Sequence, residues 1–346
     1  MLSEKNVSLL RNELETAKNP LFFYDADGDG LAAFLLLYRI HREGKGVRIN
    51  TSNVNIQGMR KVEELNPDKI FILDVPVVQQ EFLDNAHRPV FWIDHHQPLQ
   101  LNKVSYFNPR IKDPDAYIPT SRMAWQISEN PADMWIAMIG SLADWHLPDF
   151  TQEFMAQYPD LLKHNDLTKA SYKSKIGVLM KFFFFIQKGP SNEVHKCIKT
   201  LTRIKSPYEI LNQETAQGKF LWKQFQKINE KYEELLKDAK KGVKGGRILL
   251  YHYSENQWSF TANLANELMA TYPKKVVIIA RSKGGEMKCS LRAQFRISGA
   301  LEKALQGIEG RGGGHPNACG AVIKEEDWSA FLSKFKEEIK NINIEV

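Results

Sequence analysis

Four short runs of apolar, β-forming residues alternate with helix-forming stretches in the first hundred residues, and this alternation constrains the fold most. The runs are 20–24 (PLFFY), 47–51 (VRINT), 69–73 (KIFIL) and 89–93 (PVFWI). The stretch 31–42 (LAAFLLLYRIHR) is too long for a strand and has the composition of a helix. Apolar strands separated by helices are typical of a parallel sheet buried on both faces. The sequence therefore predicts an α/β fold with a wound parallel sheet.

An aspartate directly follows three of these runs: Asp25, Asp74 and Asp94. Because the carboxyl ends of parallel strands line the ligand crevice of such a sheet, we expect the three side chains to converge at one edge. A single aspartate in this position is often only a turn former or a helix cap. Three of them within about 70 residues favour a functional site over that alternative.

Further carboxylates and imidazoles accompany these strand ends. Asp25 and Asp27 alternate with small residues in a turn (DADGDG), residues 94–96 read Asp-His-His, and Asp144 follows an apolar stretch. Oxygen donors predominate in this set, which favours Mn²⁺ or Mg²⁺ over Zn²⁺. An aspartate shared by two such ions would hold them about 3.5 to 4 Å apart, the spacing used for in-line displacement at phosphorus. These residues predict metal-assisted hydrolysis of a phosphate ester.

A glycine run near the C-terminus predicts a phosphate-binding turn. Residues 311–317 (RGGGHPN) combine bare backbone N–H groups with a guanidinium and an imidazole, a composition suited to cradling phosphate. Ser290, Arg292 and Arg296 lie shortly upstream, where they could bind further phosphates. A glycine turn without a ligand is the alternative, and the three glycines taken alone favour it.

The length of 346 residues exceeds what one hydrophobic core usually organises. We expect a catalytic domain over 1–185, a helical connector over 186–244 and a smaller mixed α/β domain over 245–346. Within the connector, 237–246 (KDAKKGVKGG) has the charged, glycine-containing composition of a linker. In the last domain we expect strands at 247–253, 275–281 and 286–292, and helices at 262–272, at 299–306 and from about 325 onward.

Charge is distributed unevenly along the chain. Residues 1–160 contain 22 Asp and Glu against 15 Lys and Arg, whereas residues 161–346 contain 32 Lys and Arg against 19 Asp and Glu. An acidic first part and a basic remainder are what a metal site and a polyanion-binding surface would produce. For residues 161–240, lysine-rich helices that are simply solvated remain an equally good explanation.

Cysteine usage and hydropathy exclude several classes of protein. The three cysteines lie far apart without a CxxC spacing, which argues against a disulfide framework and a zinc site. No apolar stretch approaches the roughly 18 residues that span a bilayer, and the first residues lack the pattern of a secretory signal. We therefore expect a cytoplasmic protein without a membrane partner.

The motifs resemble those of a known family, the DHH phosphoesterases. Residues 25–28 (DADG), Asp74, 94–96 (DHH) and Asp144 resemble its four N-terminal motifs, and 312–315 (GGGH) resembles the hallmark of the associated C-terminal domain. The family includes RecJ single-strand exonucleases, oligoribonucleases that also dephosphorylate 3′-phosphoadenosine 5′-phosphate, and cyclic-dinucleotide phosphodiesterases. Among these, the chain resembles the compact, two-domain archaeal RecJ-like exonucleases.

The resemblance implies a role for each matching residue. Asp74 would bridge two Mn²⁺ or Mg²⁺ ions, Asp94 would orient the histidine pair, and His96 would lie near the scissile phosphate. The implied metal ligands are Asp25, Asp27, Asp74, His95 and Asp144, and the implied catalytic residues are Asp94, His95 and His96. The implied substrate-binding residues are Arg292, Gly313, Gly314 and His315, to which the composition of this region adds Ser290, Arg311 and Gly312.

The chain departs from the family at the first motif. Many members have a histidine a few residues before the first aspartate, whereas this chain has Leu-Phe-Phe-Tyr at 21–24. Either water or the additional carboxylate of Asp29 could complete that metal position. We interpret Asp29 instead as the cap of the helix that follows.

The resemblance implies a divalent-metal-dependent exonuclease that degrades single-stranded DNA or RNA to mononucleotides. It also implies that short oligonucleotides can bind and that a DNA replication or repair protein can be a partner. One alternative is a small-substrate enzyme: a nanoRNase, a 3′-phosphoadenosine 5′-phosphate phosphatase or a cyclic-dinucleotide phosphodiesterase. Another is a weakly active nucleic-acid-binding accessory protein, for which the missing histidine is the only hint. The basic balance of residues 161–346 favours a polymeric substrate.

Overall fold

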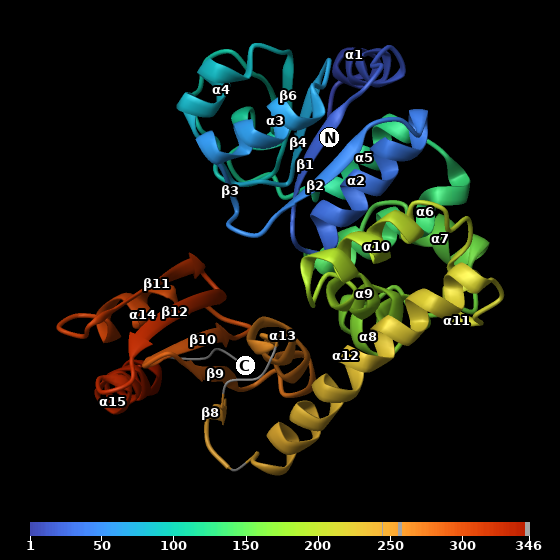
Figure 1. Ribbon diagram of the computed structural model, residues 1–346. Coiled ribbons are helices and arrows are strands. Elements are labelled where there is room, and N and C mark those ends of the chain that lie inside the picture. The colour runs from blue at the N-terminus through green and yellow to red at the C-terminus, as the bar shows by residue number, and fades with distance from the viewer. Residues whose placement is uncertain (244, 255–257, 343–346) are drawn as a thin grey trace. The chain divides into compact units, whose positions relative to one another are not determined.

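A computed structural model describes residues 1–243, 245–254 and 258–342. The chain divides into two compact units, Met1–Phe225 and Gln226–Val346, and Figure 1 shows the elements of each. The first unit contains a parallel sheet covered by helices and the second contains a smaller mixed sheet, so the predicted α/β class is confirmed. The division into segments that end at residues 185 and 244 stays a prediction.

The sheet of the first unit has the strand order β2-β1-β4-β6-β7, and all its pairs are parallel. Four of its strands agree with the predicted runs to within a few residues, while β7 and the separate β3–β5 pair were not predicted. The strands are β1 (Leu21–Asp25), β2 (Lys45–Ile49), β3 (Asn53–Val54), β4 (Ile70–Leu73), β5 (Val77–Val78), β6 (Val90–Ile93) and β7 (Ser105–Phe107).

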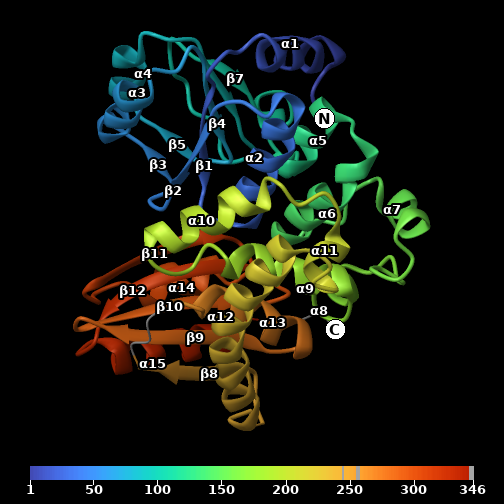
Figure 2. The same cartoon turned by 45° about the vertical axis from the view of Figure 1, so that its right-hand side comes forward.

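Helices cover both faces of this sheet, and every residue of β4 and β6 is therefore buried. On one face, Phe23, Ile72 and Trp92 form a core with residues of α3 and α4. On the other face, Phe22 and Tyr24 pack against Phe34 of α2. Helix α2 in turn contacts α5 and α6 (Figure 2). The helices are α1 (Glu4–Glu15), α2 (Gly28–His41), α3 (Met59–Leu65), α4 (Gln80–Ala86), α5 (Thr120–Ser128) and α6 (Met134–Ala143), with 3₁₀ turns at Ile56–Gly58, Pro109–Ile111 and Pro131–Asp133.

The middle of the chain is helical, as the sequence predicts. Helix α12 runs across the division between the two units and continues to Lys241, so it includes the first half of the predicted linker at 237–246. Residue 244 lies outside the described residues. The helices of this part are α7 (Thr151–Gln157), α8 (Leu167–Tyr172), α9 (Lys175–Phe185), α10 (Ser191–Leu201), α11 (Pro207–Leu211) and α12 (Ala216–Lys241).

The sheet of the second unit has the order β11-β12-β10-β9-β8, in which only the β8–β9 pair is parallel. Its core combines Ile278 and Leu291 with Phe331 and Phe335. The elements are β8 (Ile248–Tyr253), α13 (Thr261–Thr271), β9 (Val276–Lys283), β10 (Glu286–Arg292), α14 (Ser298–Ala304), β11 (Gly310–His315), β12 (Ala318–Lys324) and α15 (Trp328–Lys340).

The prediction of a turn over the glycine run was wrong, because these residues form the edge strand β11, which pairs with β12. A Cβ atom at Gly312 would lie 2.9 Å from the Cβ of Ala321, and one at Gly314 would lie 2.5 Å from the carbonyl oxygen of Ala318. Gly314 also has a φ of 136°, which strongly favours glycine. The glycines therefore allow two strands to approach closely.

The cysteines and the hydropathy of the chain can be compared with the structure. Cys197, Cys289 and Cys319 are free and buried. Among the described residues, no helix is both long enough and apolar enough to cross a membrane.

We predict that Gly140→Ala destabilises the first unit. A Cβ at Gly140 would lie 2.5 Å from the Cβ of Ser121 and 2.7 Å from that of Ala32, so α6 would have to move away from α5 and α2. Overpacking of this kind costs about 1–3 kcal/mol, which urea unfolding would measure. The matched control is Gly299→Ala, also in a helix, where a Cβ meets nothing within 4 Å. Equal stability of the two variants would contradict the prediction.

Candidate active site

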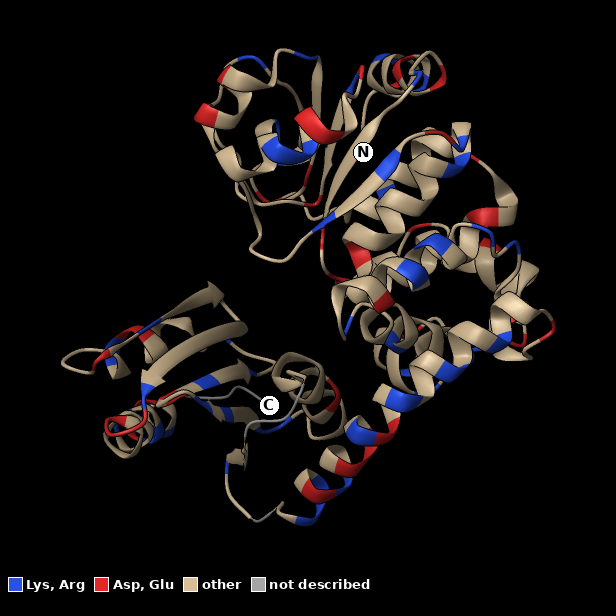
Figure 3. Ribbon diagram, viewed as in Figure 1, with Lys and Arg blue, Asp and Glu red and all other residues tan. Residues whose placement is uncertain are grey.

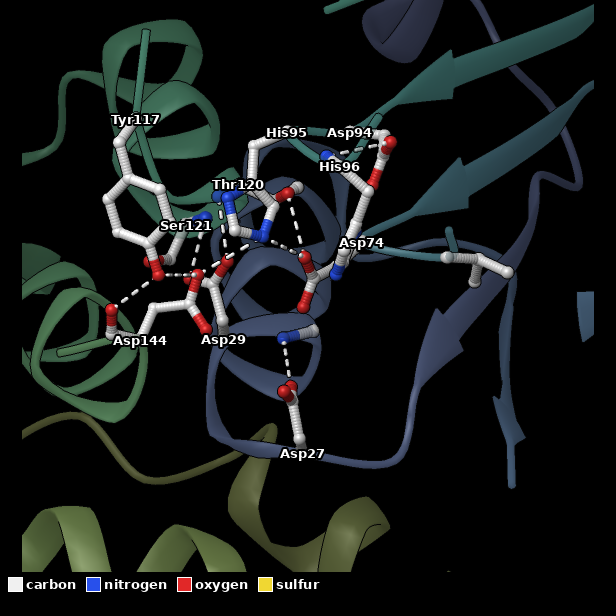
Figure 4. Close-up of polar contacts among 12 residues, drawn as sticks. Asp27, Asp29, Asp74, Asp94, His95, His96, Tyr117, Thr120, Ser121 and Asp144 are labelled. Atoms are coloured by element: carbon white, nitrogen blue, oxygen red, sulfur yellow. Dashed lines mark hydrogen bonds and ion pairs between the residues drawn. The ribbon is translucent and has the colours of Figure 1, made fainter. Parts of the chain in front are cut away.

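Acidic side chains gather at the carboxyl ends of the parallel strands, as the sequence predicts. Asp25 is the last residue of β1, and Asp74 and Asp94 directly follow β4 and β6. Asp74 is 1% exposed and Asp94 is fully buried. Figure 4 shows that His95, Asp29 and Asp144 lie close to Asp74. Two groups have ligand atoms within 4.8 Å of one another: Asp74 with His95 and His96, and Asp29 with His95 and Asp144.

His95 belongs to both groups. Its Nε2 lies 3.3 Å from Oδ1 of Asp74 and 3.1 Å from Oδ2 of Asp144. Its Nδ1 is buried and has no hydrogen-bond partner within the described part of the chain. Burial lowers the pKa of His95, which favours the neutral imidazole that metal ions bind. A buried neutral imidazole between carboxylates fits a site for Mn²⁺ or Mg²⁺.

Asp29 has a different role from the one we predicted. The cap of α2 is Asp27, whose Oδ1 accepts a hydrogen bond from the amide of Gly30. The fully buried carboxylate of Asp29 instead accepts hydrogen bonds from the backbone amides of Thr120 and Ser121, at 2.7 and 3.0 Å, at the start of α5. The expectation that Asp29 caps its own helix was therefore wrong. The alternation of three aspartates at 25, 27 and 29 is the signal that could have revealed it.

Asp74 adopts a left-handed backbone conformation, with a φ of 60°, directly after β4. Its amide donates to the carbonyl oxygen of Ile93, and its Oδ1 accepts a hydrogen bond from the hydroxyl of Thr120 at 3.0 Å. A non-glycine residue in this region stores backbone strain, which concentrates at functional sites. Thr120, which was not among the predicted site residues, thus supports Asp74 as well as Asp29.

Asp25 and Asp27 lie outside the two tightest groups but interact with them electrostatically. Burial and the charge of Asp27 raise the pKa of Asp25 to about 7. Burial raises the pKa of Asp74 well above its usual value, and the charges of Asp29, Asp27, Asp144 and Asp25 raise it further. These five carboxylates therefore share one region of high negative potential.

Asp94 points away from this cluster and holds His96. Its Oδ2 accepts the amide of His96 at 3.0 Å, and its Oδ1 lies 2.7 Å from Nδ1 of the same ring. The hydroxyl of Tyr106 also donates to Asp94. Burial lowers the pKa of His96, but the hydrogen bond and charge of Asp94 outweigh it, so the net pKa is raised. The side chain of His96 is 29% exposed, and its Nε2, for which the described part of the chain provides no hydrogen-bond partner, can reach a ligand.

The second unit brings four of the predicted phosphate-binding residues to one face of its sheet. Ser290 and Arg292 are two residues apart on β10, and Gly313 and His315 are two residues apart on β11. Each pair lies opposite the same two residues of β12. Since directly opposed residues point to the same side of a sheet, all four share a face.

The other predicted members of this set are divided between the two faces. Arg311 shares the face of Gly313, because the two are two residues apart on β11. Gly312 and Gly314 belong to the opposite face. The guanidinium of Arg292 is held by Asn266, whose side-chain oxygen accepts from Nε at 2.6 Å. The face therefore offers cationic groups beside bare glycine backbone.

Comparison with known proteins matches each unit to a domain family. Residues 21–145 match the DHH family, N-terminal domain, and residues 249–341 match the DHHA1 domain. No curated protein sequence matches the chain.

Three solved structures share the fold at low sequence identity. RecJ from Thermus thermophilus in complex with Mn²⁺ is 16% identical with a TM-score of 0.69, and the match covers 98% of this chain but 55% of that one. An exonuclease RecJ bound to manganese is 16% identical with a TM-score of 0.57, over 98% and 94% of the two chains. The DHH domain of a member of a ribosomal-protein family is 14% identical with a TM-score of 0.68, over 98% and 90%.

The present chain spans about half the length of the Thermus RecJ chain. Its two domain matches occur in the order that the motifs predict, and its fold is that of RecJ. The chain belongs to the DHH phosphoesterase family, with an N-terminal DHH domain followed by a DHHA1 domain.

Proposed function

We propose that this chain is a divalent-metal-dependent exonuclease that hydrolyses single-stranded DNA or RNA to mononucleotides. The observation that carries the proposal is the cluster of Asp29, Asp74, Asp144 and His95, which is largely buried at the ends of parallel strands. Buried like charges are unfavourable without a compensating cation. The membership in a phosphoesterase family makes phosphodiester hydrolysis the reaction that such a cation would serve.

We propose that the cluster holds two Mn²⁺ or Mg²⁺ ions. Asp74 would be the shared ligand, because a carboxylate can bind two ions whereas one ring nitrogen binds only one, and its Oδ1 lies 3.3 Å from Nε2 of His95, which belongs to both groups of ligand atoms. We add Asp29 to the ligands that the resemblance implies, which are Asp25, Asp27, Asp74, His95 and Asp144. Bound ions of this kind supply positive charge that polarises a phosphate and activates a water nucleophile. The solved RecJ structures with Mn²⁺ support this choice of metal.

His96 is the proposed proton donor. Asp94 fixes its Nδ1, and the raised pKa favours the protonated ring near neutral pH. A proton on Nε2 would then stabilise a phosphate oxygen or pass to the leaving oxygen of the nucleotide. Asp94 acts through His96, so it is a positioning residue in this scheme.

The second unit is proposed to bind the other phosphates of the substrate. Arg292, Arg311 and His315 share a sheet face with Ser290 and the backbone of Gly313. The excess of Lys and Arg over residues 161–346 favours a polymer over a small substrate. The alternative of a weakly active accessory protein was based on the missing histidine of the first motif. Asp29 provides a carboxylate that can replace this histidine as a ligand.

Digestion of end-labelled DNA and RNA 20-mers with Mn²⁺ or Mg²⁺ tests the proposal. We expect processive loss of mononucleotides and faster turnover of the 20-mer than of the matched dinucleotide, because a longer strand contacts more cationic groups. Rates on the dinucleotide that equal or exceed those on the 20-mer would favour a nanoRNase. Release of phosphate from 3′-phosphoadenosine 5′-phosphate or cleavage of a cyclic dinucleotide alone would favour the other small-substrate enzymes.

Asp74→Asn is expected to lower kcat/KM for Mn²⁺-dependent hydrolysis by more than about 100-fold, the upper end for losing an outer-shell partner of a metal. An amide oxygen can still accept the hydrogen bond of Thr120, so the far-UV circular dichroism should not change. Asp84→Asn is the matched control, since Asp84 lies on the surface and pairs only with Lys103 and Gln80 in the described contacts. Full activity of the Asp74 variant would refute the metal assignment.

Metal-free protein is expected to lose thermal stability as the pH rises from 5 to 8. Burial and the charge of Asp144 raise the pKa of Asp29 to about 8. Burial and the charge of Asp27 raise the pKa of Asp144 to about 7. These groups bind protons more tightly when folded, so their stabilisation is complete at low pH and disappears as the pH passes through the folded values.

Added Mn²⁺ should restore the unfolding temperature most strongly at pH 8, because the ion replaces the protons. Scanning calorimetry with EDTA or Mn²⁺ measures both effects. Asp29→Asn should make the metal-free curve flatter. A metal-free Tm that is constant or rises across this range would contradict the titration of the cluster.

A further inference from the structure

A slot lies at the outer edge of the first sheet. Strand β2 is an edge strand, and among the described strands it pairs with β1 alone. Residues of β2, α3 and α10 line a pocket of about 490 Å³, within the range of about 300–1,000 Å³ found for ligand-binding pockets. Figures 1 and 2 both show α10 beside β2. The free edge of the sheet therefore lies between two helices rather than in open solvent.

The backbone of β2 presents unpaired groups to this slot. The amide of Lys45 donates to the carbonyl oxygen of Pro20, which directs Lys45, Val47 and Ile49 toward β1. In a parallel pair the intervening residues turn their N–H and C=O groups the other way. Gly46 and Arg48 thus face the slot, and no backbone partner within the described ranges pairs with them. Such groups are a template for another strand.

The slot is lined by cationic and apolar side chains. Lys45 of β2 and Lys199 of α10 are exposed and have no carboxylate partner among the described ion pairs, whereas Lys61 pairs with Glu64 at 2.6 Å. Figure 3 shows Lys or Arg on all three elements. The largely buried side chains of Val194 and Ile198, from α10, form an apolar wall. An occupant with alternating acidic and apolar side chains would complement this lining.

The aromatic residues of the slot do not favour a nucleic acid. Tyr24 and Phe34 are 1% and 2% exposed, and their rings stack on each other at 4.7 Å. The third aromatic residue of the lining, Tyr38, is half-buried, and its ring lies 5.6 Å from that of Phe34. A Cβ at Gly46 would lie 2.5 Å from Phe34, so β2 covers that ring as well. Base stacking needs an exposed aromatic face. Alternating N–H and C=O groups match a peptide backbone better than a row of phosphates.

We propose that an acidic, extended segment of a partner protein adds to β2 as a further strand of the sheet. The backbone groups of Gly46 and Arg48 pair with the segment, Lys45 and Lys199 bind its carboxylates, and its apolar side chains pack on Ile198. Main-chain hydrogen bonds supply the affinity and the flanking side chains supply the selectivity. This docking site does not depend on the proposed exonuclease activity.

The probe for this site is a fluorescein-labelled eight-residue peptide in which valine alternates with glutamate, measured by fluorescence anisotropy with the full chain. We expect saturable binding that weakens about tenfold in Lys199→Glu, because a favourable charge contact becomes repulsive. Lys5→Glu, an exposed position on α1 outside the slot, is the matched control and should bind as the unmodified chain does. A peptide with lysine in place of glutamate should not bind.

A second pair of variants separates strand addition from simple charge attraction. Arg48→Pro removes an amide that faces the slot while leaving the β1–β2 hydrogen bonds intact, since edge strands tolerate proline there. Arg48→Ala removes the same side chain, including its contact with the carbonyl oxygen of Gln187, but keeps the amide. We expect the proline variant to bind the peptide about tenfold more weakly than the alanine variant. Hydrogen exchange over 45–49 should slow when the peptide binds.

Several results would overturn the proposal. Equal peptide affinity of the proline and alanine variants would show that no backbone pairing occurs. Competition by oligothymidylate of the same charge would identify a nucleic-acid site instead. Self-association that disappears in Arg48→Pro, seen by light scattering, would make a second copy of this chain the occupant. Hydrolysis of the dinucleotide substrate should be the same in Lys199→Glu and the unmodified chain, so loss of docking is distinguishable from loss of the proposed function.

Discussion

The approach of buried carboxylates at the strand ends is the constraint on which the rest of the first unit depends. Asp29 and Asp74 repel each other, and both are held in place by the start of α5: the amides of Thr120 and Ser121 bind Asp29, and the hydroxyl of Thr120 binds Asp74. The position of α5 therefore determines the geometry of the cluster. Gly140 permits the close packing of α6 against α5 that fixes this position. Tight helix packing thus offsets an unfavourable electrostatic arrangement.

The strands and the aspartates that follow them could be predicted because both are local properties of the sequence. An apolar run such as that of β4 (Ile70–Leu73) can be buried only between two covered faces, and the residue after it must lie at the rim. The role of Asp29 could not be predicted in this way. Its partner Thr120 is 91 residues away along the chain. A local rule could offer only the cap of the nearest helix, and Asp27 occupies that position.

The glycine run of the second unit shows a different limit. Glycine has a low preference for strands, so Gly312–Gly314 indicates a turn when it is considered alone. These glycines form a strand instead, because the small residues of β12 allow β11 to pack close beside them. The residue types at Ser290, Arg292 and His315 could be selected from the sequence, but their common face depends on the register of three strands. Strands as short as β3 and β5 carry too few residues for any pattern.

In the proposed metal site, the cluster would also determine how metal binding responds to pH. The hydrogen bonds to Asp29 and Asp74 fix the positions of these proposed ligands, so little ordering entropy would remain to be lost on binding an ion. The same burial raises the pKa of Asp29 to about 8 and that of Asp144 to about 7, so protons compete for these oxygens at neutral pH. An incoming ion must displace them. Preorganisation therefore raises the intrinsic affinity while proton competition lowers the apparent one, and the balance between the two shifts toward the metal as the pH increases.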